Sequence, residues 1–154
     1  MVAMLVMMAL IGTNPDAPTP LIRCREAVAL MHLNETDILY DLGCGDGRVC
    51  ILASEMTGCR AVGVDIQAAK IETAREAAKM RFVADRTAFY RQDIMEIELN
   101  KLPATVFYVY LPQELLNRLL PRLEKCKGAR VISYMHQLAA PLKAKHSEFY
   151  VYQF

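Results

Sequence analysis

Three glycines at alternate positions follow an acid at the end of an apolar stretch, in the run Asp41-Leu42-Gly43-Cys44-Gly45-Asp46-Gly47-Arg48. Glycine has no Cβ atom, so it adopts positive φ without strain and lets backbone N–H groups approach a ligand closely. A helix that begins after Gly47 would direct the positive end of its dipole at a carboxylate or phosphate. The spacing is tighter than the G-x-G-x-x-G of dinucleotide-binding folds, so the run predicts a different kind of ligand-binding turn.

The chain around this turn alternates between apolar segments of strand length and segments with a helical pattern. This alternation is typical of a single α/β domain with an open, mostly parallel twisted sheet and helices on both faces. We predict strands at 37–42, 60–65, 87–91, 104–111, 129–135 and 148–154, and helices at 21–33, 47–56, 67–81 and 113–125.

Three of the predicted strands end at or near a carboxylate, namely Asp41, Asp65 and Asp93. One such aspartate is usually a helix cap or a turn former. Ligands of open α/β sheets bind outside the carboxyl ends of the strands. Three acids at one edge therefore predict a polar rim around a single site.

The run from Asp41 to Arg48 resembles the first motif of class I S-adenosylmethionine-dependent methyltransferases. Over about residues 15–135 the chain is also similar to the small archaeal protein-lysine methyltransferases and to the mitochondrial enzymes that methylate the ATP-synthase c-subunit lysine. This resemblance implies a single Rossmann-like domain that transfers a methyl group from S-adenosylmethionine to a lysine of a protein. The further segments that support it are Pro18-Thr19-Pro20, Val62–Ile66, Tyr110-Leu111-Pro112 and Gly128–Ser133.

The resemblance implies which residues hold the methionine end of the cofactor. The loop residues Gly43, Cys44 and Gly45 would surround it, and Asp41 would lie near its ammonium group or a bridging water. Thr19 would lie over the carboxylate in a gate segment, although Pro18-Thr19-Pro20 could also be a plain linker.

The adenosine end would be held by two further acids. Asp65 would accept hydrogen bonds from both ribose hydroxyls, because a carboxylate accepts two in one plane; its alternative role is to cap the helix that starts at Gln67. Asp93 would accept from the adenine amino group between the apolar side chains of Ile66 and Ile94, or else it is a loop acid in water.

The acceptor side is expected to be aromatic. A lysine with a pKa of about 10.4 must lose its proton before methylation, and burial among aromatic rings lowers that pKa. Tyr108 and Tyr110 share one face of a strand, with Leu111-Pro112 as the rim. We predict Tyr110 and His136 as catalytic-site residues; Tyr108 could equally be core, and a lone histidine is often a surface residue. An acidic or amide residue followed by Pro-Pro-Tyr or Pro-Tyr is absent there, which disfavours adenine or glutamine as the acceptor.

The C-terminal end departs from the family. The segment 136–147 is short and has no tryptophan, so we expect the C-terminal hairpin to be shortened, with one strand missing. The last strand would then form an exposed edge, which favours self-association.

The remaining composition sets limits on partners. With 154 residues and a net charge of +1, the chain fits one domain and shows no general affinity for nucleic acid. Five cysteines without metal-ligand spacing predict no metal and a reducing, cytoplasmic location. We expect residues 1–14 to be an apolar leader and 15–154 the methyltransferase domain. The leader is too short to span a bilayer and would pack on the domain, form an interface with another chain or be the remnant of an anchor.

Two alternatives remain open. The scaffold could serve an RNA or small-molecule methyltransferase, since residues 101–154 have more basic than acidic side chains. It could also be a cofactor-binding but inactive partner subunit. A dehydrogenase is disfavoured by the glycine spacing.

Overall fold

The computed structural model describes residues 18–154, so the predicted leader at residues 1–14 lies outside the described residues. Strands and helices alternate through most of this part of the chain, as expected. The strands at 60–65 and 87–91 have the predicted bounds, and the other boundaries differ from the predicted ones by at most two residues. The elements are α2 (Leu21–Met31), β1 (Ile38–Leu42), α3 (Arg48–Thr57), β2 (Arg60–Asp65), α4 (Ala68–Met80), β3 (Thr87–Arg91), the 3₁₀ turns η1 (Ile94–Glu96) and η2 (Leu99–Lys101), β4 (Val106–Val109), α5 (Gln113–Leu123), β5 (Arg130–Tyr134), β6 (Ala144–His146) and β7 (Phe149–Gln153).

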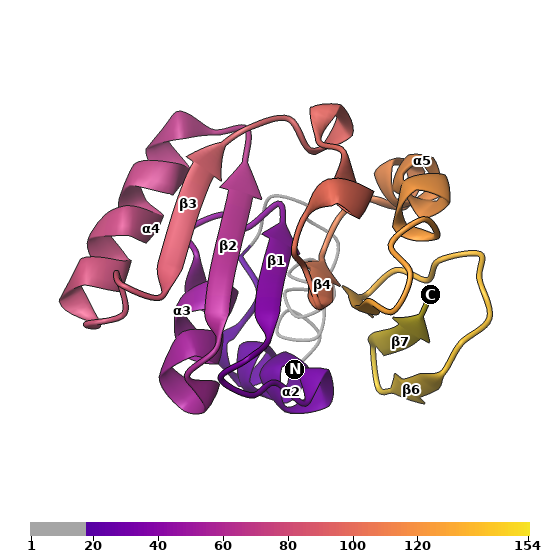
Figure 1. Ribbon diagram of the computed structural model, residues 1–154, viewed down its shortest axis with the longest axis horizontal. Coiled ribbons are helices and arrows are strands. Elements are labelled where there is room, and N and C mark those ends of the chain that lie inside the picture. Colours follow the sequence, from indigo (N-terminus) through magenta and orange to yellow (C-terminus); the bar gives the residue numbers. More distant parts are fainter. Residues whose placement is uncertain (1–17) are drawn as a thin grey trace, which may run out of the picture.

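The described strands form one sheet in the order β3-β2-β1-β4-β5-β7-β6. Strands β1 to β5 are parallel, whereas β7 is antiparallel to β5 and to β6. Figure 1 shows β1, β2 and β3 side by side with their arrowheads at the same end. The strand order reverses between β1 and β4, and ligands of open α/β sheets bind beside such a reversal. The predicted fold class is confirmed.

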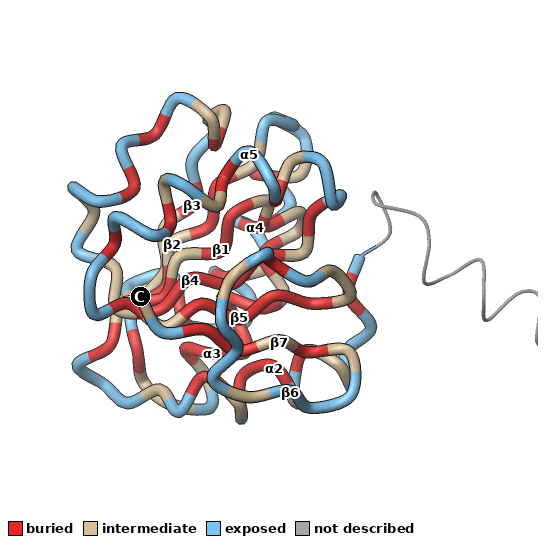
Figure 2. Tube along the Cα trace, turned by 90° about the vertical axis from the view of Figure 1, so that its right-hand side faces the viewer, coloured by how far each residue is buried: buried red, intermediate tan, exposed pale blue. Residues whose placement is uncertain are grey.

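Two apolar clusters cover the two faces of the sheet. Side chains of α2, α3 and α4 pack on one face, and side chains of α5 and the 3₁₀ turns pack on the other. Strand β4 divides its side chains between them, with Tyr108 in the first cluster and Phe107 and Val109 in the second. Figure 2 shows that the buried stretches follow the strands through the interior. This burial on both faces explains why these strands are nearly continuous apolar runs.

The C-terminal hairpin corrects one expectation. Strand β6 is present, although it has only three residues, and it pairs with β7 from Ala144↔Val151 to His146↔Phe149. The hairpin is therefore short but complete, and β7 is not an edge strand. The sequence did not indicate β6 because Lys145 and His146 are exposed, so the segment has no apolar alternation.

Candidate active site

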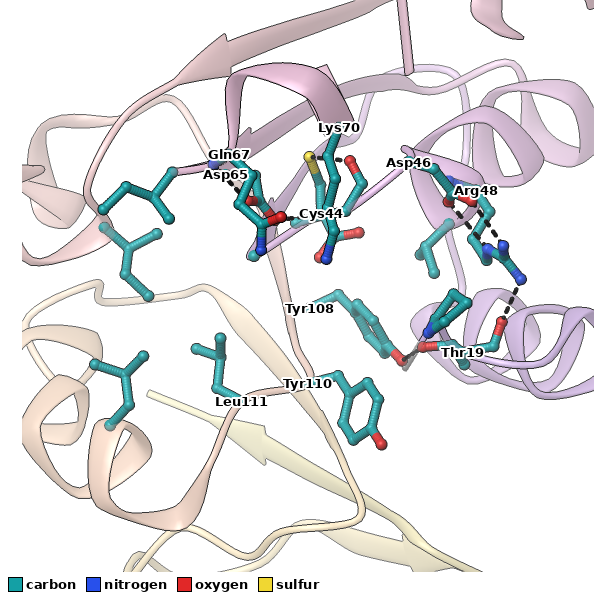
Figure 3. Close-up of a pocket in the computed structure, with 18 of the residues that line it drawn as sticks. Thr19, Cys44, Asp46, Arg48, Asp65, Gln67, Lys70, Tyr108, Tyr110 and Leu111 are labelled. Carbon is teal, nitrogen blue, oxygen red and sulfur yellow. Dashed lines mark hydrogen bonds and ion pairs between the residues drawn. The ribbon is translucent and has the colours of Figure 1, made fainter. Parts of the chain in front are cut away.

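A cavity of about 440 Å³ opens at the carboxyl ends of β1, β2 and β4. Its lining comes from the strand ends, the turns after them and the residues that precede α2. Figure 3 shows how the side chains of these separate segments face the same space. All the predicted site residues except His136 line it, namely Thr19, Asp41, Gly43, Cys44, Gly45, Asp65, Ile66, Asp93, Ile94 and Tyr110.

The glycine loop is held to the end of β2 by its own backbone. The N–H groups of Gly43 and Cys44 both donate to the Val64 carbonyl at 2.9 Å. The N–H of Gly45 donates to Asp65 Oδ2, also at 2.9 Å. Gly47 has a φ of +79°, and a Cβ atom there would lie within 2.8 Å of side chains from α4 and β3. The glycines therefore allow both the left-handed backbone and the close packing of the loop.

Asp65 lines the cavity and accepts two backbone hydrogen bonds. Its Oδ1 accepts from the N–H of Gln67 at 2.9 Å, just before α4, while its Oδ2 accepts from Gly45. Each carboxylate oxygen can accept a second hydrogen bond. The side chain therefore fixes the loop and the helix start and still has acceptor capacity toward the cavity.

Asp41 is the most deeply buried acid of the site. It is 2% exposed, and no hydrogen-bond donor from residues 18–154 reaches its carboxyl group. Burial raises its pKa to about 8, and the negative charges of Asp65 and Asp46 contribute further. An acid in this position is protonated near neutral pH unless a cation lies beside it.

Asp46 has a cationic partner, unlike Asp41. Its carboxylate accepts from Arg48 Nε at 3.0 Å and from Arg48 Nη2 at 2.6 Å, and this pairing lowers the pKa of Asp46. The third arm of the guanidinium, Nη1, donates to the Thr19 carbonyl at 3.0 Å. Figure 3 shows Arg48 between Asp46 and Thr19. No pattern in the sequence indicates this bridge.

The aromatic side of the cavity begins with two tyrosines of one strand face. Tyr108 is 1% exposed and its hydroxyl lies 3.4 Å from Thr19 Oγ1, so it is both core and cavity wall. Tyr110 is half-buried and meets Tyr134 edge-to-face, with 4.9 Å between the ring centroids. His136 is half-buried outside the lining, and its carbonyl accepts from the Ser133 hydroxyl. The structure therefore does not bring His136 to the same cavity as Tyr110.

The turn after β3 contributes Asp93 and Ile94 to the cavity lining. Asp93 Oδ1 accepts from the N–H of Met95 at 2.8 Å, which leaves Oδ2 without a partner among the described residues. Ile94 is buried beside it, whereas Ile66 is 61% exposed at the rim. Arg122 of α5 donates to the carbonyls of Ile94, Met95 and Ile97 and so fixes this turn.

Sequence reasoning missed several lining residues besides the Arg48 bridge. Gln67 and Lys70 lie at the start of α4, and Gln92 precedes Asp93. The feature of the sequence that could have indicated them is their position shortly after the predicted ends of β2 and β3. Within residues 18–154, no helix is long and apolar enough to cross a membrane, and no group of His, Cys, Asp or Glu has the arrangement of a metal site.

The strand order 3-2-1-4-5-7-6 with an antiparallel seventh strand, and a glycine loop at the carboxyl end of β1, define a class I methyltransferase, the class that takes its methyl group from S-adenosylmethionine. The family model for the ANTKMT methyltransferase domain matches residues 41–143. The chain belongs to this family, and it is an S-adenosylmethionine-dependent methyltransferase.

Two of the relatives with sequence identity above 30% are named as methyltransferases of proteins. A protein-lysine N-methyltransferase of Saccharolobus islandicus is 32% identical over 127 residues, which are 80% of this chain and 78% of that protein. The ribosomal protein L11 methyltransferase of Yersinia pseudotuberculosis is also 32% identical, but over only 58% of this chain and 29% of its own length.

Solved structures show the same fold. An RNA methyltransferase from Salinibacter ruber, in complex with S-adenosyl-L-homocysteine, superposes with a TM-score of 0.80 and 33% identity, covering 88% of this chain and 90% of that chain. A methyltransferase from Thiobacillus denitrificans gives a TM-score of 0.67 at 18% identity over 83% of this chain and 53% of its own, which supports the fold alone.

Proposed function

We propose that this enzyme transfers the methyl group of S-adenosylmethionine to a lysine amino group of a protein. The observation that carries the proposal is one continuous cavity that joins the glycine loop and its acids to the aromatic wall of Tyr108 and Tyr110. The similarity to the Saccharolobus protein-lysine methyltransferase over most of both chains supports a protein acceptor.

The cavity residues suit the parts of the cofactor as follows. Asp41 would face the ammonium group, and Thr19 would cover the carboxylate above the glycine loop. The remaining acceptor capacity of Asp65 would take the ribose hydroxyls, and the unpartnered oxygen of Asp93 would take the adenine amino group beside Ile94.

Bound S-adenosylmethionine supplies a methyl group that its positive sulfur already activates. The chain must hold the acceptor nitrogen in line with the bond between methyl carbon and sulfur, and it must exclude water. Tyr110 lines the cavity and packs edge-to-face on the buried ring of Tyr134. A lysine that entered beside Tyr110 would lose water, and this dehydration disfavours the ammonium form and lowers the pKa of the lysine. The proton of that lysine would leave to solvent before transfer, and the bound methyl donor would supply the methyl group, with the new N–C bond replacing the C–S bond.

RNA is the second candidate acceptor, because the Salinibacter relative is named an RNA methyltransferase. A net charge of +1 gives no general affinity for nucleic acid, so the protein acceptor is favoured. Radiolabelled cofactor and a cell extract, treated separately with protease and nuclease, test the choice. Label removed by protease and recovered as methylated lysine supports the proposal, whereas label removed by nuclease refutes it.

Two features of the described residues bear on the setting of the enzyme. All five cysteines are free and buried, which supports a reducing compartment such as the cytoplasm. A homo-oligomer would use the leader or an outer strand; because β7 is covered by β6, the outer strands are β3 and the three-residue β6. Gel filtration at several concentrations tests self-association.

A further inference from the structure

The segment Pro18-Thr19-Pro20, which we call the gate segment, has few ways to hold itself in place. Both prolines lack a backbone N–H, and both are exposed, whereas Thr19 between them is 6% exposed and lines the cavity. The Pro20 carbonyl accepts from the N–H of Cys24 in the first turn of α2, and Thr19 makes the contacts of the segment with the rest of the cavity wall.

Contacts with three other elements converge on Thr19. Its carbonyl accepts from Arg48 Nη1 at 3.0 Å and from the Cys24 thiol at 3.5 Å, while its hydroxyl lies 3.4 Å from that of Tyr108. Arg48 makes the strongest of these contacts, because its donor is charged and the other two are a thiol and a long hydroxyl pair.

Arg48 itself is fixed by the glycine loop. The two-point pairing with Asp46 orients the planar guanidinium so that its remaining arm points at the gate segment (Figure 3). A single side chain thus joins two walls of the cavity whose contact residues are 29 positions apart. The charged group beside it is Asp46, with Lys70 close to Asp46, and the Cys24 thiol, which is neutral near neutral pH, also lies near.

We propose that Arg48 is a positioning residue that holds the gate segment against the glycine loop and thereby sets how long the cofactor stays in the cavity. This proposal rests on the cofactor placement described above. It does not depend on the identity of the methyl acceptor, so it holds whether or not the acceptor is a lysine. Loss of the bridge leaves the carbonyl of Thr19 with only the weaker contact from the Cys24 thiol, and the segment then opens more often.

Cys24 provides a natural reporter of this opening. The thiol is fully buried under Thr19, so a maleimide reaches it when the gate segment moves away. Burial raises the pKa of Cys24 to about 11, and the positive charge of Arg48 opposes that shift. Removal of Arg48 therefore raises the pKa of the thiol further and makes it less reactive. Faster labelling of Cys24 in such a variant then reports greater exposure of the thiol to the reagent, not a more reactive thiol.

The experiment measures N-ethylmaleimide labelling of each cysteine by peptide mass spectrometry, in the intact protein with and without S-adenosyl-L-homocysteine. Cys50 in α3 reports local loss of the helix that Arg48 begins, and Cys126 after α5 reports global opening. In Arg48→Gln we expect labelling of Cys24, relative to Cys50 and Cys126, to rise about tenfold. We also expect S-adenosyl-L-homocysteine to dissociate about tenfold faster, which is the effect of losing one hydrogen bond from a charged group.

Three further variants separate positioning from other roles. Asp46→Asn should act in the same direction, and the double variant should be no worse than Arg48→Gln, because both changes break one bridge. Arg48→Lys keeps the charge but lacks the fork, so it should not restore protection of Cys24. Arg75→Gln is the matched control, since Arg75 joins Glu72 to the Phe89 carbonyl away from this cavity.

The outcomes divide clearly. Unchanged Cys24 labelling in Arg48→Gln, equal acceleration of Cys50, or full rescue by lysine would each overturn the proposal. If the wild type failed to bind S-adenosyl-L-homocysteine, the cofactor placement would be refuted instead. Labelling of Cys24 in Arg48→Gln without ligand would still test the bridge between Arg48 and Thr19.

Discussion

The buried carboxyl group of Asp41 should make the stability of this protein depend on pH in an unusual direction. The pKa of Asp41 in the folded chain is about 8, against an ordinary value of 3.8. Between these values the folded protein retains a proton that the unfolded chain releases. The contribution of Asp41 to the free energy of unfolding is therefore most favourable below about pH 4, and it falls as the pH rises toward 8.

The magnitude follows from the shift. Each pH unit between the two pKa values costs about 1.4 kcal/mol, so the free energy of unfolding should fall by about 3–4 kcal/mol from pH 5 to pH 8 through Asp41 alone. Coupling to Asp65 and Asp46 makes this an upper bound. Asp41→Asn removes the titration and keeps the size of the side chain.

Urea unfolding of both proteins at pH 5, 6, 7 and 8 measures the difference, with far-UV circular dichroism as the signal because the chain has no tryptophan. The stability of Asp41→Asn relative to wild type should rise with pH, and all other titrating groups cancel in this comparison. With saturating S-adenosyl-L-homocysteine the rise should shrink, because its ammonium group favours the ionised acid. A difference that stays constant from pH 5 to pH 8 would refute the reasoning about Asp41.

Three other substitutions test the site and its support. Asp65→Ala should weaken cofactor binding by about tenfold or more, measured by calorimetry, while the fold is retained; equal affinity would contradict the ribose assignment. Tyr110→Ala should leave cofactor affinity unchanged and reduce methyl transfer, and undiminished turnover would remove Tyr110 from the acceptor site. Gly63→Ala should destabilise the protein by about 1–3 kcal/mol, because a Cβ atom there would lie 2.7 Å from Cys44 Sγ and from Phe89 Cδ1. An unchanged urea midpoint would show that the loop yields to the added methyl group.

The parts of this enzyme that could be predicted from sequence are those with a local pattern. The glycine loop, its acid Asp41 and the strand-terminal Asp65 were recognisable because spacing and strand alternation fix their place at the sheet edge. The face shared by Tyr108 and Tyr110 followed from the two-residue period of a strand and is confirmed by their common cluster.

The parts that were missed depend on contacts between distant segments. Nothing near Arg48 in the sequence indicates that its third donor reaches Thr19. Strand β6 is stabilised by pairing with β7 rather than by its own composition, so its three residues showed no strand pattern. His136 follows a strand like the site acids do, but its backbone turns back on Ser133 and Tyr134 and leaves the side chain outside the cavity lining.

The hydrogen bonds from the glycine loop to Val64 and Asp65 have a consequence for the thermodynamics of recognition. Because these hydrogen bonds already hold the glycine loop in its conformation, binding of an adenosyl ligand costs little entropy for ordering the backbone of the loop. The entropic penalty of binding should therefore fall mainly on the segment Pro18-Thr19-Pro20. Substitutions in that segment, rather than in the glycine loop, can then change the affinity for the ligand without disturbing the sheet.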